Sequence, residues 1–118
     1  MNYDKNNIFA KILRGEVPCK KVYENEYVLA FYDVNPQKKV HVLVIPKGEY
    51  VDLDEFNSKA SDKEIIELNK AITQISNLLG IKEKGYRILT NVGSNGGQEV
   101  PHLHFHIFGG EKIGRMVV

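Results

Sequence analysis

The segment at residues 102–108 constrains the fold of this chain most, because it places three of the four histidines at every second position. Successive side chains of a β-strand point to opposite faces of a sheet. A strand here would turn three imidazoles to one face and Leu103, Phe105 and Ile107 to the other. At about 3.3 Å per residue, the row of imidazoles would span about 13 Å. We therefore predict a strand at residues 101–107 with one apolar face and one face of histidines.

Three hypotheses account for such a row. Imidazole has an ordinary pKa of about 6.5 and can act as nucleophile, acid or base near neutral pH, so one ring could attack a phosphorus or acyl centre while a neighbour handles a proton. Alternatively, histidines at every second position of one strand could bind a zinc ion. The rings could also simply lie on a solvated face. The first hypothesis is favoured.

The remaining hydrophobic pattern predicts two helices and four more strands. A helix at residues 62–79 begins with a capping box formed by Ser61 and Glu64, ends at Gly80, and should cover one face of a sheet. A shorter helix at residues 8–14 ends at Gly15. The dense β-branched residues at 40–45 indicate a central strand. The other expected strands lie at residues 20–24, 27–33 and 86–92.

Strands that follow strands, with the helices on one side, are typical of an α+β domain with an antiparallel sheet. We therefore expect about five antiparallel strands, one long helix and one or two short helices. A chain of 118 residues is long enough for one such domain, which we place at residues 7–114.

Composition narrows the classes of partner. The 16 basic and 15 acidic residues leave a formal net charge of +1, so we expect no nucleic acid partner. Cys19 is the single cysteine, which fits a reducing compartment. Neither an apolar leader nor a run of about 20 apolar residues occurs, so we expect a soluble, cytoplasmic protein without a membrane partner.

Several residues near the histidines allow two interpretations each. Glycines at 93, 96 and 97 suit a tight hairpin, or bring backbone N–H groups close to an anion, where Gln98 would add an uncharged donor. His41 is either a hydrogen-bonded core residue or, on a neighbouring strand, the residue that holds His102 in one tautomer. Asp33 either begins a turn or accepts from two ribose hydroxyls.

Beyond this local pattern, the chain resembles the Hint branch of the histidine triad family over roughly residues 7–114. The family signature His-x-His-x-His is similar to residues 102–106, and Gly109-Gly110 follows it as in the family. Further similar segments lie at residues 8–12, 15–18, 30–36, 41–47 and 96–100.

The resemblance implies a role for each candidate site residue. His104 would attack the α-phosphorus of a nucleotide and form a nucleotidyl-histidine that water hydrolyses. His106 would contact the phosphate and assist the leaving group, while His102 and His41 support the row. Asp33 would bind the ribose, Asn91, Gln98 and Val100 would lie near the phosphate, and the purine would occupy an apolar slot formed by Ile8, Phe9, Ile12, Phe31 and Val34.

The resemblance thus implies a hydrolase that converts purine nucleoside 5′-phosphoramidates, such as adenosine 5′-monophosphoramidate, to the nucleoside monophosphate and an amine. The alternatives are a dinucleoside polyphosphate hydrolase and a nucleotide-binding regulatory module with incidental activity. Some relatives have two cysteines where this chain has residues 7–10, so we expect no metal and no cofactor. A homodimer is also implied. Glu99 replaces a serine of some relatives, and we leave it out of the site.

Overall fold

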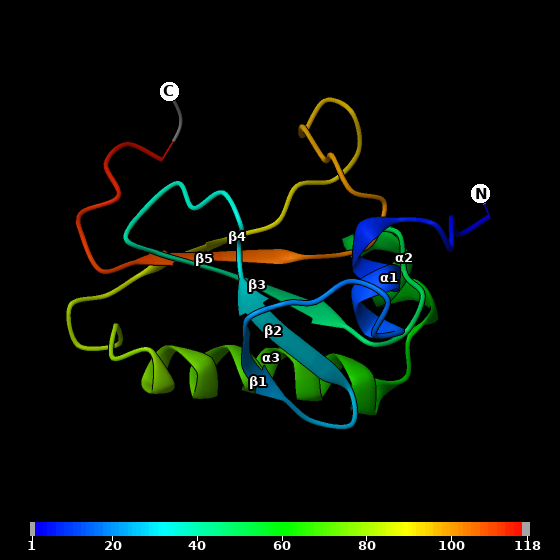
Figure 1. The fold of residues 1–118 in the computed structure, drawn as a ribbon, viewed down its shortest axis with the longest axis horizontal. Helices are drawn as coiled ribbons and strands as arrows, with labels where there is room; N and C mark the ends of the chain where they lie inside the picture. The colour runs from blue at the N-terminus through cyan, green and yellow to red at the C-terminus, as the bar shows by residue number, and fades with distance from the viewer. Residues whose placement is uncertain (1, 117–118) are drawn as a thin grey trace.

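The computed structural model describes residues 2–116 and contains a five-stranded antiparallel sheet with strand order β1-β2-β3-β5-β4. Three helices accompany the sheet, so the expected α+β class is confirmed (Figure 1). The elements in chain order are α1 (Ile8–Leu13), β1 (Lys21–Glu24), β2 (Val28–Tyr32), β3 (Val40–Pro46), α2 (Leu53–Lys59), α3 (Asp62–Leu78), β4 (Arg87–Leu89) and β5 (Phe105–Gly109).

The larger core lies between α3 and one face of the sheet. The predicted capping box begins α3, with the Ser61 hydroxyl accepting from the Glu64 N–H at 3.1 Å and the Glu64 carboxylate accepting from the Ser61 N–H at 3.0 Å. Figure 1 shows α3 extended along the sheet. Its inward face packs on β2, β3 and β5 through buried side chains, including Leu68, Ile75, Val28, Val42, Val44 and Ile107.

The second core lies on the opposite face, beneath α1. Phe9 of α1 packs there against Leu29, Phe31, Leu43 and Ile45. The prediction that the helices lie on one side is therefore wrong. Both β2 and β3 bury apolar side chains on both faces, because they are the inner strands of the sheet and need a cover on each side.

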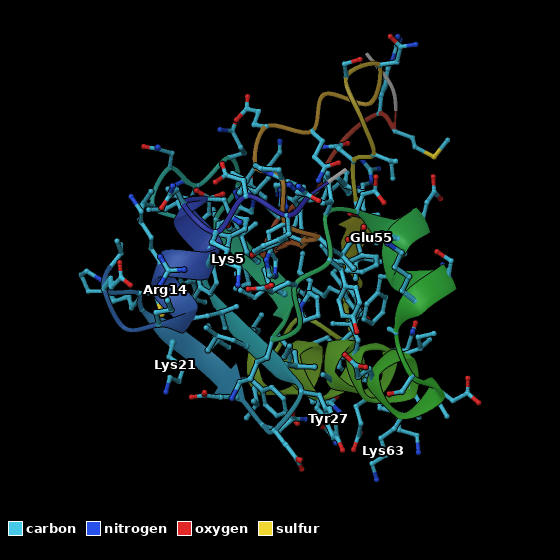
Figure 2. All side chains as sticks on the ribbon, turned by 90° about the vertical axis from the view of Figure 1, so that its right-hand side faces the viewer. Lys5, Arg14, Lys21, Tyr27, Glu55 and Lys63 are labelled. Atoms are coloured by element: carbon cyan, nitrogen blue, oxygen red, sulfur yellow. The ribbon has the colours of Figure 1, made fainter. Side chains whose placement is uncertain are left out.

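The ends of several elements differ from the sequence prediction. β5 begins at Phe105 rather than at 101, since the Leu103 N–H donates to the Tyr50 carbonyl at 2.8 Å, outside the sheet ladder. β4 covers only residues 87–89, and α2, capped by the Asp52 side chain, is the second short helix that the prediction allowed but did not locate. Figure 2 shows Lys21 and Lys63 directed away from the body of the molecule. Among residues 2–116, no helix combines the length and apolar character needed to span a membrane.

Candidate active site

Strand pairing brings two of the four histidines together. In the β3–β5 ladder His106 lies opposite Leu43 and Phe108 lies opposite His41, so the two imidazoles share one face of the sheet. His41 Nε2 and His106 Nδ1 are 2.9 Å apart. The hypothesis that His41 holds His102 is therefore wrong: β3 neighbours β5 as supposed, but the register places His41 against His106.

The hydrogen bonds of His41 fix where its proton and that of His106 reside. The backbone N–H of Gln37 donates to His41 Nδ1 at 3.1 Å, so a neutral His41 carries its proton on Nε2. That proton points to His106 Nδ1, while Asp33 Oδ2 lies 3.4 Å from the same His41 nitrogen. Because His106 Nδ1 accepts, the neutral His106 ring carries its proton on Nε2.

His102 is the innermost member of the row and is wholly buried. Its Nε2 lies 2.9 Å from the Pro46 carbonyl oxygen, which can only accept, so Nε2 is protonated and donates. Its Nδ1 then accepts from the Tyr3 hydroxyl at 2.5 Å. Both ring nitrogens of His102 are thus occupied by protein groups, which leaves this ring no lone pair for chemistry.

His104 has the opposite arrangement, with one nitrogen held and one free. Its Nδ1 donates to the His102 carbonyl oxygen at 2.7 Å, and its own carbonyl accepts from the Thr90 hydroxyl at 2.7 Å. The neutral ring therefore carries a lone pair on Nε2. Within residues 2–116 neither this atom nor His106 Nε2 has a hydrogen-bond partner, and no unpartnered side-chain nitrogen is sealed from solvent. Both atoms are accessible to a ligand.

The surroundings keep all four rings neutral at pH 7. Burial lowers the pKa of His41 and of His104 below the ordinary value. Burial also lowers the pKa of His102 to about 4, and burial together with the charges of His104 and His41 lowers the pKa of His106 to about 4. The site therefore offers an unprotonated nucleophilic nitrogen on His104 beside an N–H on His106, with the two ring centroids 5.1 Å apart.

These lowered pKa values predict acid-induced loss of stability. In the unfolded chain the rings titrate near pH 6.5, so between about pH 6.5 and 4 the unfolded chain binds more protons than the folded protein. The free energy of unfolding should be highest above about pH 6.5 and should decrease as the pH falls toward 4. His102 should contribute roughly 3 kcal/mol of this decrease. Guanidinium titrations at about pH 7, 6 and 5 measure it, in a range above most carboxyl pKa values. A constant free energy across that range would contradict these pKa values.

The turn predicted at Asp33 is confirmed, whereas its contact with a ribose stays a prediction. One carboxylate oxygen accepts from the Asn35 N–H at 2.8 Å, which forms the turn after β2, and the other lies 3.4 Å from His41 Nε2. A cavity of about 430 Å³ opens beside it, a size suited to a small ligand. Its lining includes Asp33, Val34, His41, Lys20, Tyr32, Pro36 and Lys39.

The residues predicted to hold a purine lie at different depths. Phe9 and Phe31 are buried against each other with ring centroids 5.7 Å apart, and Phe9 also packs edge-on against His104 at 4.9 Å. Ile12 and Val100 pack against this cluster. Ile8 and Val34 are exposed. The structure thus places a buried apolar cluster beside His104 through Phe9, while Ile8 and Val34 are exposed to solvent.

The glycine-rich loop at residues 93–98 closes on itself. The Gly93 N–H donates to the Gln98 side-chain oxygen at 3.1 Å, and the Gln98 amide donates to the Val51 and Val100 carbonyls. Gly97 has φ of +78°, and a Cβ on Gly96 would lie 2.5 Å from the Val92 carbonyl oxygen. The glycines thus form a turn that needs positive φ, as predicted, but residues 90–104 separate β4 from β5, so the connection is not a tight hairpin, and Gln98 ties the loop to the histidine segment. Asn91 is half-buried between β4 and this loop.

Asp33, His41 and His106 form the one group of ligand-bearing side chains within residues 2–116 that are close enough to hold a metal ion, with their ligand atoms within 4.8 Å of one another. Two imidazoles and a carboxylate suit zinc or a similar ion. Such an ion would have to displace the proton between His41 and His106. These three side chains could therefore either bind a metal ion or take part in proton transfer.

Sequence reasoning missed the residues that hold the row through their side chains or backbone. Tyr3 and Thr90 contact His102 and His104 through hydroxyls, and Gln37 and Pro46 contact His41 and His102 through the backbone. A backbone donor or acceptor has no residue signature, so Gln37 and Pro46 could not be found. Tyr3 and Thr90 lie outside the strand pattern that drew attention to the histidines.

Comparisons with known proteins agree with this geometry. The HIT domain model matches residues 14–113. An uncharacterized HIT-like protein of Azospirillum brasilense is 55% identical over 98% of this chain and 94% of its own length, and the purine nucleoside phosphoramidase of Escherichia coli K12 is 38% identical over 96% of this chain and 94% of its own. A structure of a HIT family hydrolase from Clostridium thermocellum has a TM-score of 0.88 at 41% identity, covering 98% of this chain and 99% of that one.

Proposed function

Since the chain belongs to the HIT domain (histidine triad) family, we propose that it hydrolyses purine nucleoside 5′-phosphoramidates to a nucleoside monophosphate and an amine. One observation supports this most: His104 Nδ1 is tied to the His102 carbonyl, which leaves the lone pair on Nε2 beside the protonated Nε2 of His106. The E. coli relative named above bears the same activity in its name.

The first half of the proposed reaction forms a covalent intermediate. His104 Nε2 attacks the α-phosphorus, a bond forms between them, and the bond from phosphorus to the leaving nitrogen breaks. Imidazole attacks as a neutral ring, so the lowered pKa of His104 keeps it reactive. The anionic phosphate raises the pKa of His106 on binding, so this ring takes up a proton from solvent on Nδ1 while the His41 Nε2 proton turns to Asp33 Oδ2, 3.4 Å away, and His106 gives its Nε2 proton to the leaving nitrogen.

The second half returns the site to its starting state. A water molecule attacks the phosphorus, gives a proton to His106 Nε2, and displaces His104, and the extra proton on His106 returns to solvent when the anionic product leaves. The product is the nucleoside monophosphate. Asp33 and the adjacent cavity would receive the ribose, and the apolar side chains around the buried Phe9 and Phe31 rings would receive the purine with little discrimination between adenine and guanine. The proposed site is then completed by Ile8, Ile12, Val34, Asn91, Gln98 and Val100.

Glu99 supports a phosphoramidate over a dinucleoside polyphosphate. Burial lowers the pKa of His104, whereas the negative charge of Glu99 raises it. The Glu99 carboxylate is therefore close enough to interact electrostatically with the proposed nucleophile. Glu99 is exposed in the loop three residues before His102. A negative charge at this point repels a leaving group that is itself a polyphosphate, whereas an amine is not repelled.

Parallel assays test this proposal. We expect kcat/KM for adenosine 5′-monophosphoramidate to exceed that for diadenosine tetraphosphate by more than about tenfold. Glu99→Gln should raise kcat/KM for the tetraphosphate several-fold, while Glu26→Gln in the exposed β1–β2 turn should change neither value. A preference for the tetraphosphate would favour the sister hydrolase. Tight binding of AMP with negligible turnover of both would favour the regulatory module.

The proposed reaction is metal-independent and needs no cofactor, because an imidazole nucleophile and an imidazole acid supply both required functions. A chelator should leave turnover unchanged. Zinc should inhibit by binding Asp33, His41 and His106. We further propose a cytoplasmic enzyme that acts on small nucleotides and not on nucleic acid or membranes, in keeping with one cysteine and a net charge of +1.

We also propose a homodimer that forms through β4. Within residues 2–116 this strand is an edge of the sheet and pairs with β5 alone, and Ile88 on it is exposed. An apolar edge strand favours pairing with another strand, and a second copy would extend the sheet. Sedimentation should give a dimer for the native chain and a monomer for Ile88→Lys. A monomeric native chain at micromolar concentration would refute this proposal.

A further inference from the structure

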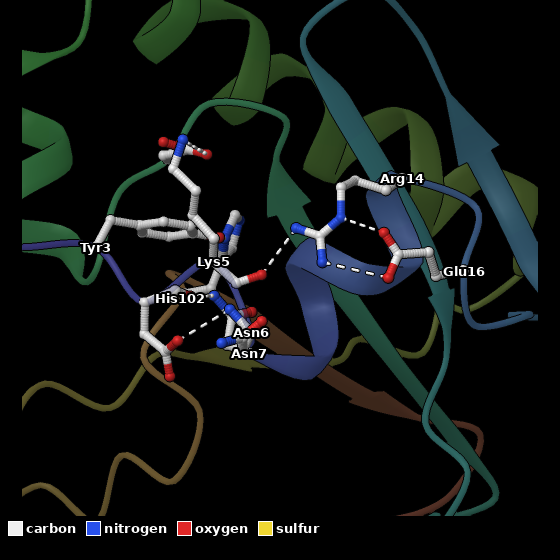
Figure 3. A network of polar contacts seen from close by, with 9 residues as sticks. Tyr3, Lys5, Asn6, Asn7, Arg14, Glu16 and His102 are labelled. Atoms are coloured by element: carbon white, nitrogen blue, oxygen red, sulfur yellow. Dashed lines mark hydrogen bonds and ion pairs between the residues drawn. The ribbon is translucent and has the colours of Figure 1, made fainter.

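The segment before α1 folds into a compact turn beside the histidines. Asp4 accepts at its carbonyl from the Asn7 side chain at 2.7 Å, and Asn7 in turn caps α1 by accepting from the Ala10 N–H at 2.8 Å. The Lys5 carbonyl accepts from Arg14 at 2.7 Å. Figure 3 shows this network at the beginning of α1, with Tyr3 and His102 at one side of it. The position of Tyr3 is thus set by a folded turn anchored to the helix.

Tyr3 supplies the one donor available to His102 Nδ1 in the described part of the chain. The Pro46 carbonyl holds the proton of this ring on Nε2, so Nδ1 must accept, and the Tyr3 hydroxyl lies 2.5 Å from it. His102 is wholly buried, so water cannot replace the phenol as a donor without opening the site. The Tyr3 ring also packs edge-on against the imidazole, with centroids 5.6 Å apart.

The backbone carbonyl of His102 links its position to that of His104. The His102 carbonyl accepts from His104 Nδ1 at 2.7 Å, and that bond decides which nitrogen of His104 has the lone pair. Phe9 contacts both rings, at 6.3 Å from His102 and 4.9 Å from His104. The placement of His102 is therefore coupled to the orientation of His104 through this backbone bond and through the shared contact with Phe9.

We propose that Tyr3 is a positioning residue for catalysis: its hydroxyl donates to Nδ1 and, together with the Pro46 carbonyl, holds the His102 ring in place, and His102 in turn orients His104. The HIT domain match begins at residue 14, so Tyr3 lies outside it. This inference rests on the proposed function insofar as His104 is taken as the nucleophile. The contact between Tyr3 and His102 does not depend on the substrate.

Tyr3→Phe tests the inference, because it removes the hydroxyl and keeps the ring. With adenosine 5′-monophosphoramidate, kcat should fall about 5- to 10-fold and KM change less than about twofold, as expected for a lost hydrogen bond that orients a catalytic group. Tyr23→Phe is the matched control, because it removes a hydroxyl that donates to Gln74 at 2.5 Å on the far edge of the sheet. It should leave kcat unchanged.

Nitrogen NMR of labelled histidine provides a readout that needs no turnover. The His102 ring should show a protonated Nε2 and an unprotonated Nδ1 in the native chain, and the Nδ1 resonance should shift in Tyr3→Phe but not in Tyr23→Phe. In a His102→Asn background, Tyr3→Phe should lower kcat less than twofold further. An unchanged kcat, an unchanged His102 spectrum, or additive losses in the double variant would each overturn the inference. A native chain inactive on the phosphoramidate would refute the proposed function, and the spectra would still decide the role of Tyr3.

Discussion

His104→Ala should lower kcat for adenosine 5′-monophosphoramidate by at least about 10⁴-fold, because it removes the nitrogen that would bond to phosphorus. The dissociation constant of AMP should change less than about fivefold, since the cavity beside Asp33 and the apolar side chains around Phe31 are left intact. Steady-state kinetics and calorimetric titration with AMP measure the two quantities.

His104→Asn is the matched control for this variant. The asparagine amide can still donate to the His102 carbonyl in place of Nδ1, but it has no counterpart of Nε2. It should therefore be as inactive as the alanine variant. If the asparagine variant kept more than about a tenth of the native kcat, the role of His104 would be orientation and the proposed nucleophile would be wrong.

His106→Gln should show the second largest effect, a fall in kcat of about 10²- to 10³-fold on phosphoramidates of basic amines. A glutamine amide can reach toward the position of Nε2 and donate a hydrogen bond, but it cannot transfer a proton. The contact of His106 with His41 at 2.9 Å would also be lost. The size of the loss should depend on how much the leaving group needs a proton.

The leaving group distinguishes proton transfer from simple binding. With the p-nitrophenyl ester of AMP, whose leaving group departs as a stable anion, the loss caused by His106→Gln should shrink below about tenfold. Comparison of the two substrates in the same variant measures this difference. An equal loss on both would show that His106 binds the phosphate without donating a proton.

The alternating pattern of residues 102–107 was sufficient to predict the faces of the histidine segment. Leu103 and Ile107 are buried in the core against α3, as predicted, although β5 begins only at Phe105. Side-chain alternation nevertheless persists before the strand begins, since Leu103 lies in the same core as Ile107 while the His102 and His104 rings both contact Phe9. The predicted central place of β3 is also confirmed, since a strand buried on both faces has a recognisable run of β-branched residues.

The contacts between the histidines could not be predicted, because they depend on register. The sequence indicated that His41 could lie on a strand beside the row, but a shift of one residue decides which ring it meets, and the structure pairs it with His106. The role of α1 was missed in the same way. Its apolar residues predicted a helix, and nothing in their spacing indicates which face of the sheet the helix covers.

The protonation state of each imidazole likewise could not be predicted from the sequence. An imidazole has three protonation states, and the choice among them here comes from the Pro46 and His102 carbonyls and the Gln37 N–H. These are backbone groups brought together by folding. A sequence shows that a histidine is present, whereas the structure shows which of its nitrogens is free.

The most direct measurement is to trap the intermediate. Native protein is mixed with adenosine 5′-monophosphoramidate, quenched within milliseconds at alkaline pH, where a phosphorus–imidazole bond is stable, and digested for mass spectrometry. Our account predicts one adenylyl group, located on His104, which forms at least as fast as the amine is released. An adenylyl group on another residue, or turnover that proceeds without any covalent adduct, would contradict it.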